Sequence, residues 1–260
     1  MGSFTAVTLA SLVAVCVVMA VTAVAGFRLG RHNVVDVSWG LAFVAVAASA
    51  FLAGDGEFAR RLVLLALVSV WGARLAWHMF RRTSGHGEDP RYAEMLARTG
   101  GNPVWAAVRK IYLTQAAAAW FVSLPIQVAA VSSGVLGWIA FAGIVLWMTG
   151  IAFEAVGDYQ LRRFKESPAH RGKVMDRGLW AWTRHPNYFG DACVWWGIFL
   201  IAADAWPGVL TVLSPVLMTY FLAFATGGKL LEKYMQDRPG YAEYQQRVSF
   251  FFPLPPRSHA

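Results

Sequence analysis

Long apolar runs constrain this chain more than any other feature of its sequence. A helix needs roughly 20 apolar residues to cross the hydrocarbon layer of a bilayer. Seven windows meet or approach that length: residues 4–26, 34–53, 62–80, 106–131, 135–156, 188–203 and 206–226. The first lacks a basic leading segment and is too long for a signal-peptide core, so we expect it to be retained. The sixth is short, so it should tilt or pack inside the protein. The chain is predicted to be an all-α integral membrane protein of about seven transmembrane helices.

The basic residues predict an orientation for these helices. The chain has 23 Lys and Arg, 15 Asp and Glu, and a formal net charge of +8. With the N-terminus outside, 20 of the 23 bases fall on inner segments, Arg60 and Arg61 lie outside, and Arg74 falls within a span. Bases concentrate on cytoplasmic loops by the positive-inside rule, so topology explains the charge without nucleic acid. We expect a bacterial inner-membrane protein with its C-terminal tail in the cytoplasm.

The polar residues collect on three inner segments, residues 81–102, 157–187 and 228–260. No G-x-G-x-x-G or P-loop spacing occurs in the chain, and no Cys/His cluster has metal-ligand spacing. We therefore expect no metal. A basic, aromatic inner face suits a phosphate-rich cofactor, because Arg forks grip phosphates and Trp or Tyr rings stack on a base.

The stretch "RHPNYFGD" places polar groups at the mouth of the sixth helix: Arg184, His185, Asn187, Tyr188 and Asp191. Helix capping by Asn187, with Asp191 favoured by the helix dipole, is one explanation. Capping requires only one such residue, however. The cluster is therefore predicted to form the floor of a cofactor pocket.

Several motifs resemble the steroid 5α-reductase family, especially its bacterial branch of membrane reductases. "GLWAWTRHPNYFGD" followed by "WWG" is similar to the C-terminal signature of that family. "EAVGDYQLRRFK", "RPGYAEYQQRVSFFFP", "NVVDVSWG" and "GEDPRY" agree with the family pattern in order, over roughly residues 30 to 255. The resemblance implies a seven-helix enzyme that takes hydride from NADPH and reduces an activated carbon–carbon double bond in a lipid, such as a 3-oxo-steroid.

The resemblance also implies a set of cofactor-binding residues. Arg162 and Arg184 are candidates to hold phosphates, and Trp180 to stack on a ring. The family's cofactor positions correspond to Glu154, Asp158, Lys173, Asn187, Tyr188 and Asp191, with Lys229, Tyr241 and Tyr244 in the tail. On this interpretation the chain is a single membrane domain, in which residues 1–132 face the substrate and residues 133–260 bind NADPH.

Two departures from the family pattern leave other functions open. Glu154 replaces an amide-bearing residue, and Arg184-His185-Pro186 replaces small residues. That triplet also occurs in isoprenylcysteine and phospholipid methyltransferases, so the alternative is an S-adenosylmethionine-dependent methyltransferase of a lipid or prenyl thiol. A second alternative is a non-catalytic lipid- or sterol-binding membrane protein.

The front half holds the candidate catalytic residues. Asp36 opens the second span, where a charge is costly unless it is paired or functional. A neutral Asp36 could stabilise charge developing on a substrate carbonyl oxygen, with Tyr112 as a second donor. The alternative is an ion pair with Arg74 that holds two helices together.

Overall fold

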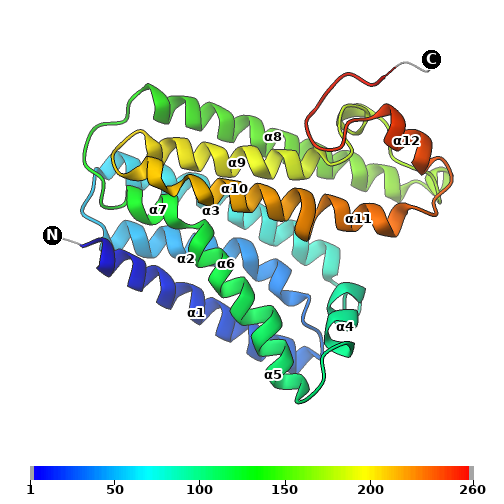
Figure 1. Ribbon diagram of the computed structural model, residues 1–260, viewed down its shortest axis with the longest axis horizontal. Coiled ribbons are helices and arrows are strands. Elements are labelled where there is room, and N and C mark those ends of the chain that lie inside the picture. Colours follow the sequence, from blue (N-terminus) through cyan, green and yellow to red (C-terminus); the bar gives the residue numbers. More distant parts are fainter. Residues whose placement is uncertain (1–2, 258–260) are drawn as a thin grey trace. The chain divides into compact units, whose positions relative to one another are not determined.

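The computed structural model describes residues 3–257, and these residues are helical apart from turns, loops and an isolated bridge between Thr183 and Ser249 (Figure 1). Five helical stretches are long and apolar enough to cross a membrane. They are α1 (Phe4–Leu29), α2 (Val34–Ala53), α3 (Phe58–Thr83), α8 (Trp138–Glu166) and the stretch Gly208–Met235. This architecture confirms the all-α class and is compatible with a multi-pass membrane protein.

Two of the seven predicted windows, the fourth and the sixth, are not among these five long stretches. The fourth window is divided into α5 (Pro103–Ala107), the π-helix η1 (Val108–Leu113), α6 (Thr114–Val122) and α7 (Leu124–Ala129). A proline in the first turn of α7 cannot donate a backbone hydrogen bond, which favours the break before it. The sixth window forms α9 (Pro186–Ala203), which has 18 residues.

The remaining elements are short. The last apolar stretch consists of η4 (Gly208–Val212), α10 (Leu213–Tyr220), the π-helix η5 (Phe221–Ala225) and α11 (Gly228–Met235). Loop and tail helices are α4 (Pro90–Ala97), η2 (Pro168–His170), η3 (Gly178–Ala181) and α12 (Tyr241–Arg247).

The described residues form two compact units. Unit 1 contains the chain up to Trp138 together with Ile201–Thr211, and unit 2 contains Ile139–Leu200 and the chain from Val212 onward.

In unit 1, α1 packs on α2 and α2 packs on α3. Gly40 and Gly72 bring the backbones of α2 and α3 into contact, since a Cβ on either would overlap the other's carbonyl. At the start of α3, the fully buried Arg60 lies 3.2 Å from a carboxylate oxygen of Asp204 and donates to the carbonyl of Ile201 at 2.5 Å. One face of α1 leaves a row of apolar side chains exposed, as lipid-facing helices do: Leu9, Val13, Val17, Val21 and Val24.

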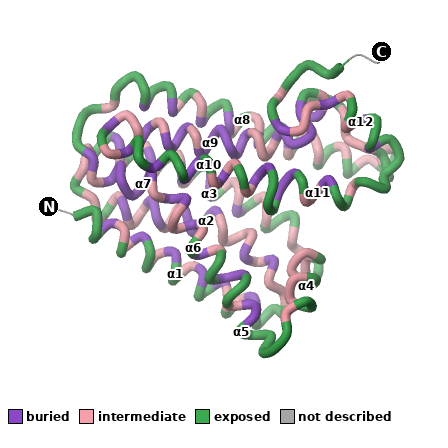
Figure 2. The backbone as a smooth tube through the Cα atoms, in the orientation of Figure 1, coloured by how far each residue is buried: buried purple, intermediate pink, exposed green. Residues whose placement is uncertain are grey.

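In unit 2, α8 and α9 are in close contact along a ladder of small residues. A Cβ on Gly197 would lie 2.6 Å from the carbonyl oxygen of Gly143, and one on Gly190 would lie 2.5 Å from that of Gly150. One further step along, Gly157 faces Pro186. The helices are therefore antiparallel, with glycines every seventh residue at the contact. Figure 2 shows that α9 is buried along most of its length.

Candidate functional site

Four polar side chains lie along the contact between α8 and α9. The Nδ2 of Asn187 donates to a carboxylate oxygen of Asp158 at 3.2 Å, and both residues are partly buried. One turn away, Glu154 is buried beside Gly190, and the adjacent Asp191 is buried as well. We call Glu154, Asp158, Asn187 and Asp191 the polar seam. The structure thus brings together four of the residues that the sequence predicted to bind a cofactor.

Helix capping does not account for the polar seam. The helix α9 begins at Pro186, so Asn187 lies inside its first turn rather than before it. Its Oδ1 accepts from the backbone N–H of the adjacent Tyr188 at 3.1 Å, whereas a capping side chain reaches two or three residues onward. Asp191 lies beyond the first turn, where the helix dipole acts weakly.

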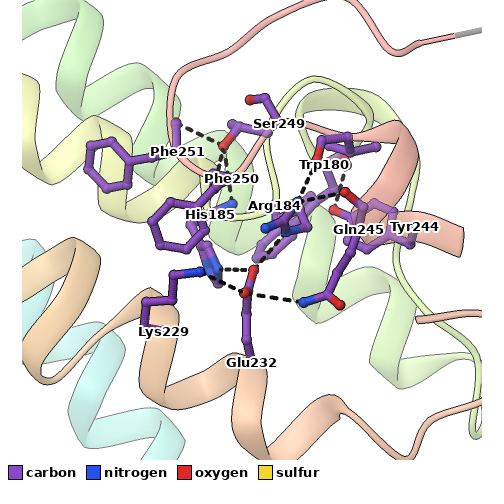
Figure 3. Close-up of polar contacts among 12 residues, drawn as sticks. Trp180, Arg184, His185, Lys229, Glu232, Tyr244, Gln245, Ser249, Phe250 and Phe251 are labelled. Carbon is purple, nitrogen blue, oxygen red and sulfur yellow. Dashed lines mark hydrogen bonds and ion pairs between the residues drawn. The ribbon is translucent and has the colours of Figure 1, made fainter. Parts of the chain in front are cut away.

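Arg184 and His185 hold the C-terminal tail (Figure 3). Nε of Arg184 donates to a carboxylate oxygen of Glu232 at 2.7 Å, and its Nη1 donates to the carbonyls of Gln245 and Val248 at 2.9 and 2.6 Å. Nε2 of His185 lies 3.3 Å from the same Glu232 oxygen. The Arg184 and Glu232 side chains are only 9% and 6% exposed. Most of the Arg184 fork is therefore engaged within the protein.

The tail also packs on the loop before α9. Tyr241 and Tyr244 form a small buried core with Val248, and the Tyr244 hydroxyl donates to the carbonyl of Trp180 at 2.7 Å. The indole Nε1 of Trp180 donates in turn to the carbonyl of Gly157 at 3.0 Å. Burial, together with neighbouring Glu232, raises the pKa of Tyr241 to about 12. Trp180, Tyr241 and Tyr244, which the sequence predicted to bind a cofactor, thus hold the tail against the loop.

The other predicted residues of unit 2 are more accessible. Arg162 and Lys173 are exposed, and Arg162 lies 3.8 Å from Glu166. Lys229 is half exposed, with its Nζ 4.6 Å from the ring centre of Phe250. The ring of Tyr188 stacks on His185 at 5.7 Å.

In unit 1, Asp36 is bound by the loop helix α4. The Tyr92 hydroxyl donates to one oxygen of Asp36 at 2.6 Å, and Arg91 lies 3.4 Å from the other. Arg91 also pairs with Asp89 at 2.9 Å. Burial and the adjacent Asp36 carboxylate raise the pKa of Tyr92 well above its ordinary value, so Tyr92 remains a donor.

The turn between α1 and α2 is held by the same loop. Glu88 accepts from the backbone N–H groups of His32 and Asn33 at 2.5 and 3.0 Å. Nδ1 of His32 lies 2.8 Å from the hydroxyl oxygen of Tyr112, which the π-helix η1 carries.

Glu232, Tyr92 and His32 are absent from the site residues predicted from the sequence. Their partners lie 48, 56 and 80 residues away in the chain, so no local spacing reveals them.

Comparison with known proteins places the chain in a family. It is 26% identical over 231 residues to an uncharacterised protein of Schizosaccharomyces pombe, a match that covers 77% of this chain and 65% of that protein. The chain therefore corresponds to about two thirds of the length of this relative. No solved structure matches the chain. The family model described as "Protein of unknown function (DUF1295)" matches residues 14–248, and the chain belongs to this family.

Proposed function

We propose that this protein is a membrane reductase that uses NADPH to saturate an activated carbon–carbon double bond in a lipid. The observation that carries the proposal is the polar seam, which lies where the C-terminal half of α8 meets the start of α9. Polar and ionisable groups in membrane helices are costly and commonly serve function. Two i, i+4 pairs facing each other, Glu154/Asp158 and Asn187/Asp191, exceed what a helix start requires.

The chemistry of these groups fits the two ends of a dinucleotide differently. The carboxylates of the polar seam accept hydrogen bonds, which suits ribose hydroxyls and a carboxamide N–H but repels phosphate. Exposed cations at the end of α8 and in the loop that follows it suit the phosphates: Arg162, Arg163, Arg171, Lys173 and Arg177. Arg184 contributes indirectly, by holding the tail in place.

NADPH, when bound, would supply a hydride for the β-carbon of the double bond, and a proton would have to reach the α-carbon to give the saturated lipid. The chain has to orient the lipid, exclude water and stabilise charge on the conjugated carbonyl oxygen. Asp36 has both oxygens engaged by Tyr92 and Arg91, so we assign it to positioning the α4 loop rather than to polarising substrate.

The proposal includes seven spans, with the N-terminus outside and the tail in the cytoplasm, where NADPH is available. Its basis is the 20-to-2 division of bases outside the spans. Reporter fusions after Pro256 should be active only on the cytoplasmic side. Activity on the exported side would reverse the orientation.

A thermal-shift experiment on detergent-purified protein tests the function. We expect NADPH to raise the midpoint of unfolding, corresponding to about 2.7 kcal/mol at a hundredfold excess over Kd. Asp158→Asn and Asn187→Ala should lose this effect. Asp176→Asn is the matched control: it breaks a 2.8 Å pair with Arg247 in the same unit and should leave the NADPH effect intact.

The same experiment separates the other functions. Stabilisation by S-adenosylmethionine but not by NADPH would identify a methyltransferase. Stabilisation by neither, with lipid binding retained, would indicate a lipid-binding protein without a cofactor. Unchanged NADPH affinity in both seam variants would show that the polar seam is structural.

A further inference from the structure

The turn between α1 and α2 holds a histidine whose orientation is set by a tyrosine. Nδ1 of His32 and the hydroxyl oxygen of Tyr112 are 2.8 Å apart. Tyr112 is 3% exposed, and its hydroxyl has no other hydrogen-bond partner among residues 3–257. A buried O–H without an acceptor is costly, so the phenol donates to Nδ1.

This hydrogen bond determines which nitrogen of His32 carries the proton. A neutral imidazole that accepts at Nδ1 is protonated at Nε2. In the described part of the chain the His32 ring makes no second hydrogen bond, and the residue is only partly buried. A donor in a fixed direction therefore remains available at Nε2.

Several independent features hold this pair in place. The π-helix η1 carries Tyr112, and π-turns often occur at functional sites. A Cβ at Gly26 would overlap the Tyr112 hydroxyl, so glycine leaves the space that the phenol occupies. The ring of Phe27 meets the His32 ring edge-on at 5.2 Å, and Glu88 accepts from the His32 backbone N–H.

We propose that His32 donates a hydrogen bond from Nε2 to the carbonyl oxygen of a conjugated ketone lipid. The inference rests on the proposed reductase function, in which negative charge develops on that oxygen. Tyr112 is then a positioning residue, which acts by keeping the proton of His32 on Nε2. The hydrogen bond at one ring nitrogen of a histidine sets which nitrogen carries the proton.

The test uses cholest-4-en-3-one with ¹³C at its carbonyl carbon, bound to the full chain in lipid nanodiscs without NADPH. A hydrogen bond lowers the carbonyl stretching frequency in isotope-edited infrared spectra. We expect a lowered band with the natural protein. His32→Phe should return it to the position seen in lipid alone and weaken binding roughly 2- to 10-fold, as loss of one neutral hydrogen bond does.

Two further variants distinguish positioning from structure. His32→Gln keeps an N–H near Nε2 and should retain part of the shift. Tyr112→Phe should bind the probe with a smaller shift, because Nδ1 can then carry the proton. His86→Phe, on the exposed neighbouring loop, is the matched control and should change nothing. A purely structural pair would lower thermal stability in both single variants without moving the band.

Equal bands in the natural protein and in His32→Phe, or no binding of the ketone, would overturn the assignment. The thermal shift with NADPH is measured on the same preparations. A lowered band without NADPH stabilisation refutes the reductase proposal and retains a ketone site at His32. NADPH stabilisation without a lowered band refutes the ketone site at His32 and retains the reductase proposal.

Discussion

Neutralising Glu232 is the sharpest perturbation of the tail, because Arg184 depends on it. Glu232→Gln keeps the shape of the side chain and removes its charge. The Arg184 and Glu232 side chains are 9% and 6% exposed and 2.7 Å apart, so little water can replace the lost partner. Breaking a buried pair from one side costs about 3–5 kcal/mol. The amide oxygen still accepts one hydrogen bond, so we expect a cost near the lower limit, about 3 kcal/mol.

The cost should fall on the tail rather than on the whole molecule. Arg184 donates to Gln245 and Val248, and its backbone N–H donates to Ser249 at 2.9 Å. A local cost of about 3 kcal/mol increases the open population more than a hundredfold. Hydrogen exchange and limited proteolysis over residues 241–257 measure that opening directly.

A matched variant removes an exposed pair on the same carboxylate. The Lys229 side chain is 53% exposed and its Nζ lies 4.0 Å from Glu232, so Lys229→Gln should cost no more than about 1 kcal/mol. Equal exchange in Glu232→Gln and Lys229→Gln would refute the reasoning.

Three other perturbations test further contacts. Gly150→Ala places a Cβ 2.5 Å from a carbonyl oxygen of α9 and should lower the free energy of unfolding by about 1–3 kcal/mol. Gly87→Ala, with open space around it, should be near neutral in the same thermal unfolding assay. Similar midpoints for the two variants would contradict the close helix contact. Tyr92→Phe removes a 2.6 Å bond to Asp36 and should cost about 1.5–3 kcal/mol by the same assay, while a loss below about 0.5 kcal/mol would show that this bond contributes little. The pKa of Tyr241 is raised to about 12, so the folded state holds that proton more tightly than the unfolded state. Its contribution to stability should be complete below about pH 10 and be lost between there and about pH 12, and a Tyr241→Phe variant with an unchanged alkaline transition would refute this.

Much of the architecture follows from the sequence, because the need for about 20 apolar residues per span is local. The windows at residues 4–26, 34–53 and 62–80 correspond closely to α1, α2 and α3. The window at 106–131 is mostly apolar, with Arg109 and Lys110 near its start, yet it folds as four short helices. Composition reveals the length of a span but not a π-turn. The π-helix η1 carries Tyr112, whose partner His32 is 80 residues away in the chain.

Some residues of the candidate site could also be predicted from the sequence, and others could not. Asp158 and Asn187 could be selected because polar motif residues stand out from an apolar chain, and the structure brings them within 3.2 Å. The structural roles of Tyr241 and Tyr244 could not be predicted. The sequence of a short amphipathic helix has the same pattern whether its tyrosines bind a ligand or form a core. Glu232 was hidden since its partners are set by tertiary packing alone.

The buried arginines also have a consequence for synthesis. Arg60 is fully buried, yet its carboxylate partner, Asp204, is made 144 residues later. Arg184 is followed by Glu232 after 48 residues and by the Val248 carbonyl after 64. A nascent chain cannot desolvate either cation until its partner has been translated, because an unmatched buried charge costs several kcal/mol. Each unit therefore locks only after its distant segment emerges, and a ribosome that stops early releases a chain in which both arginines still require water.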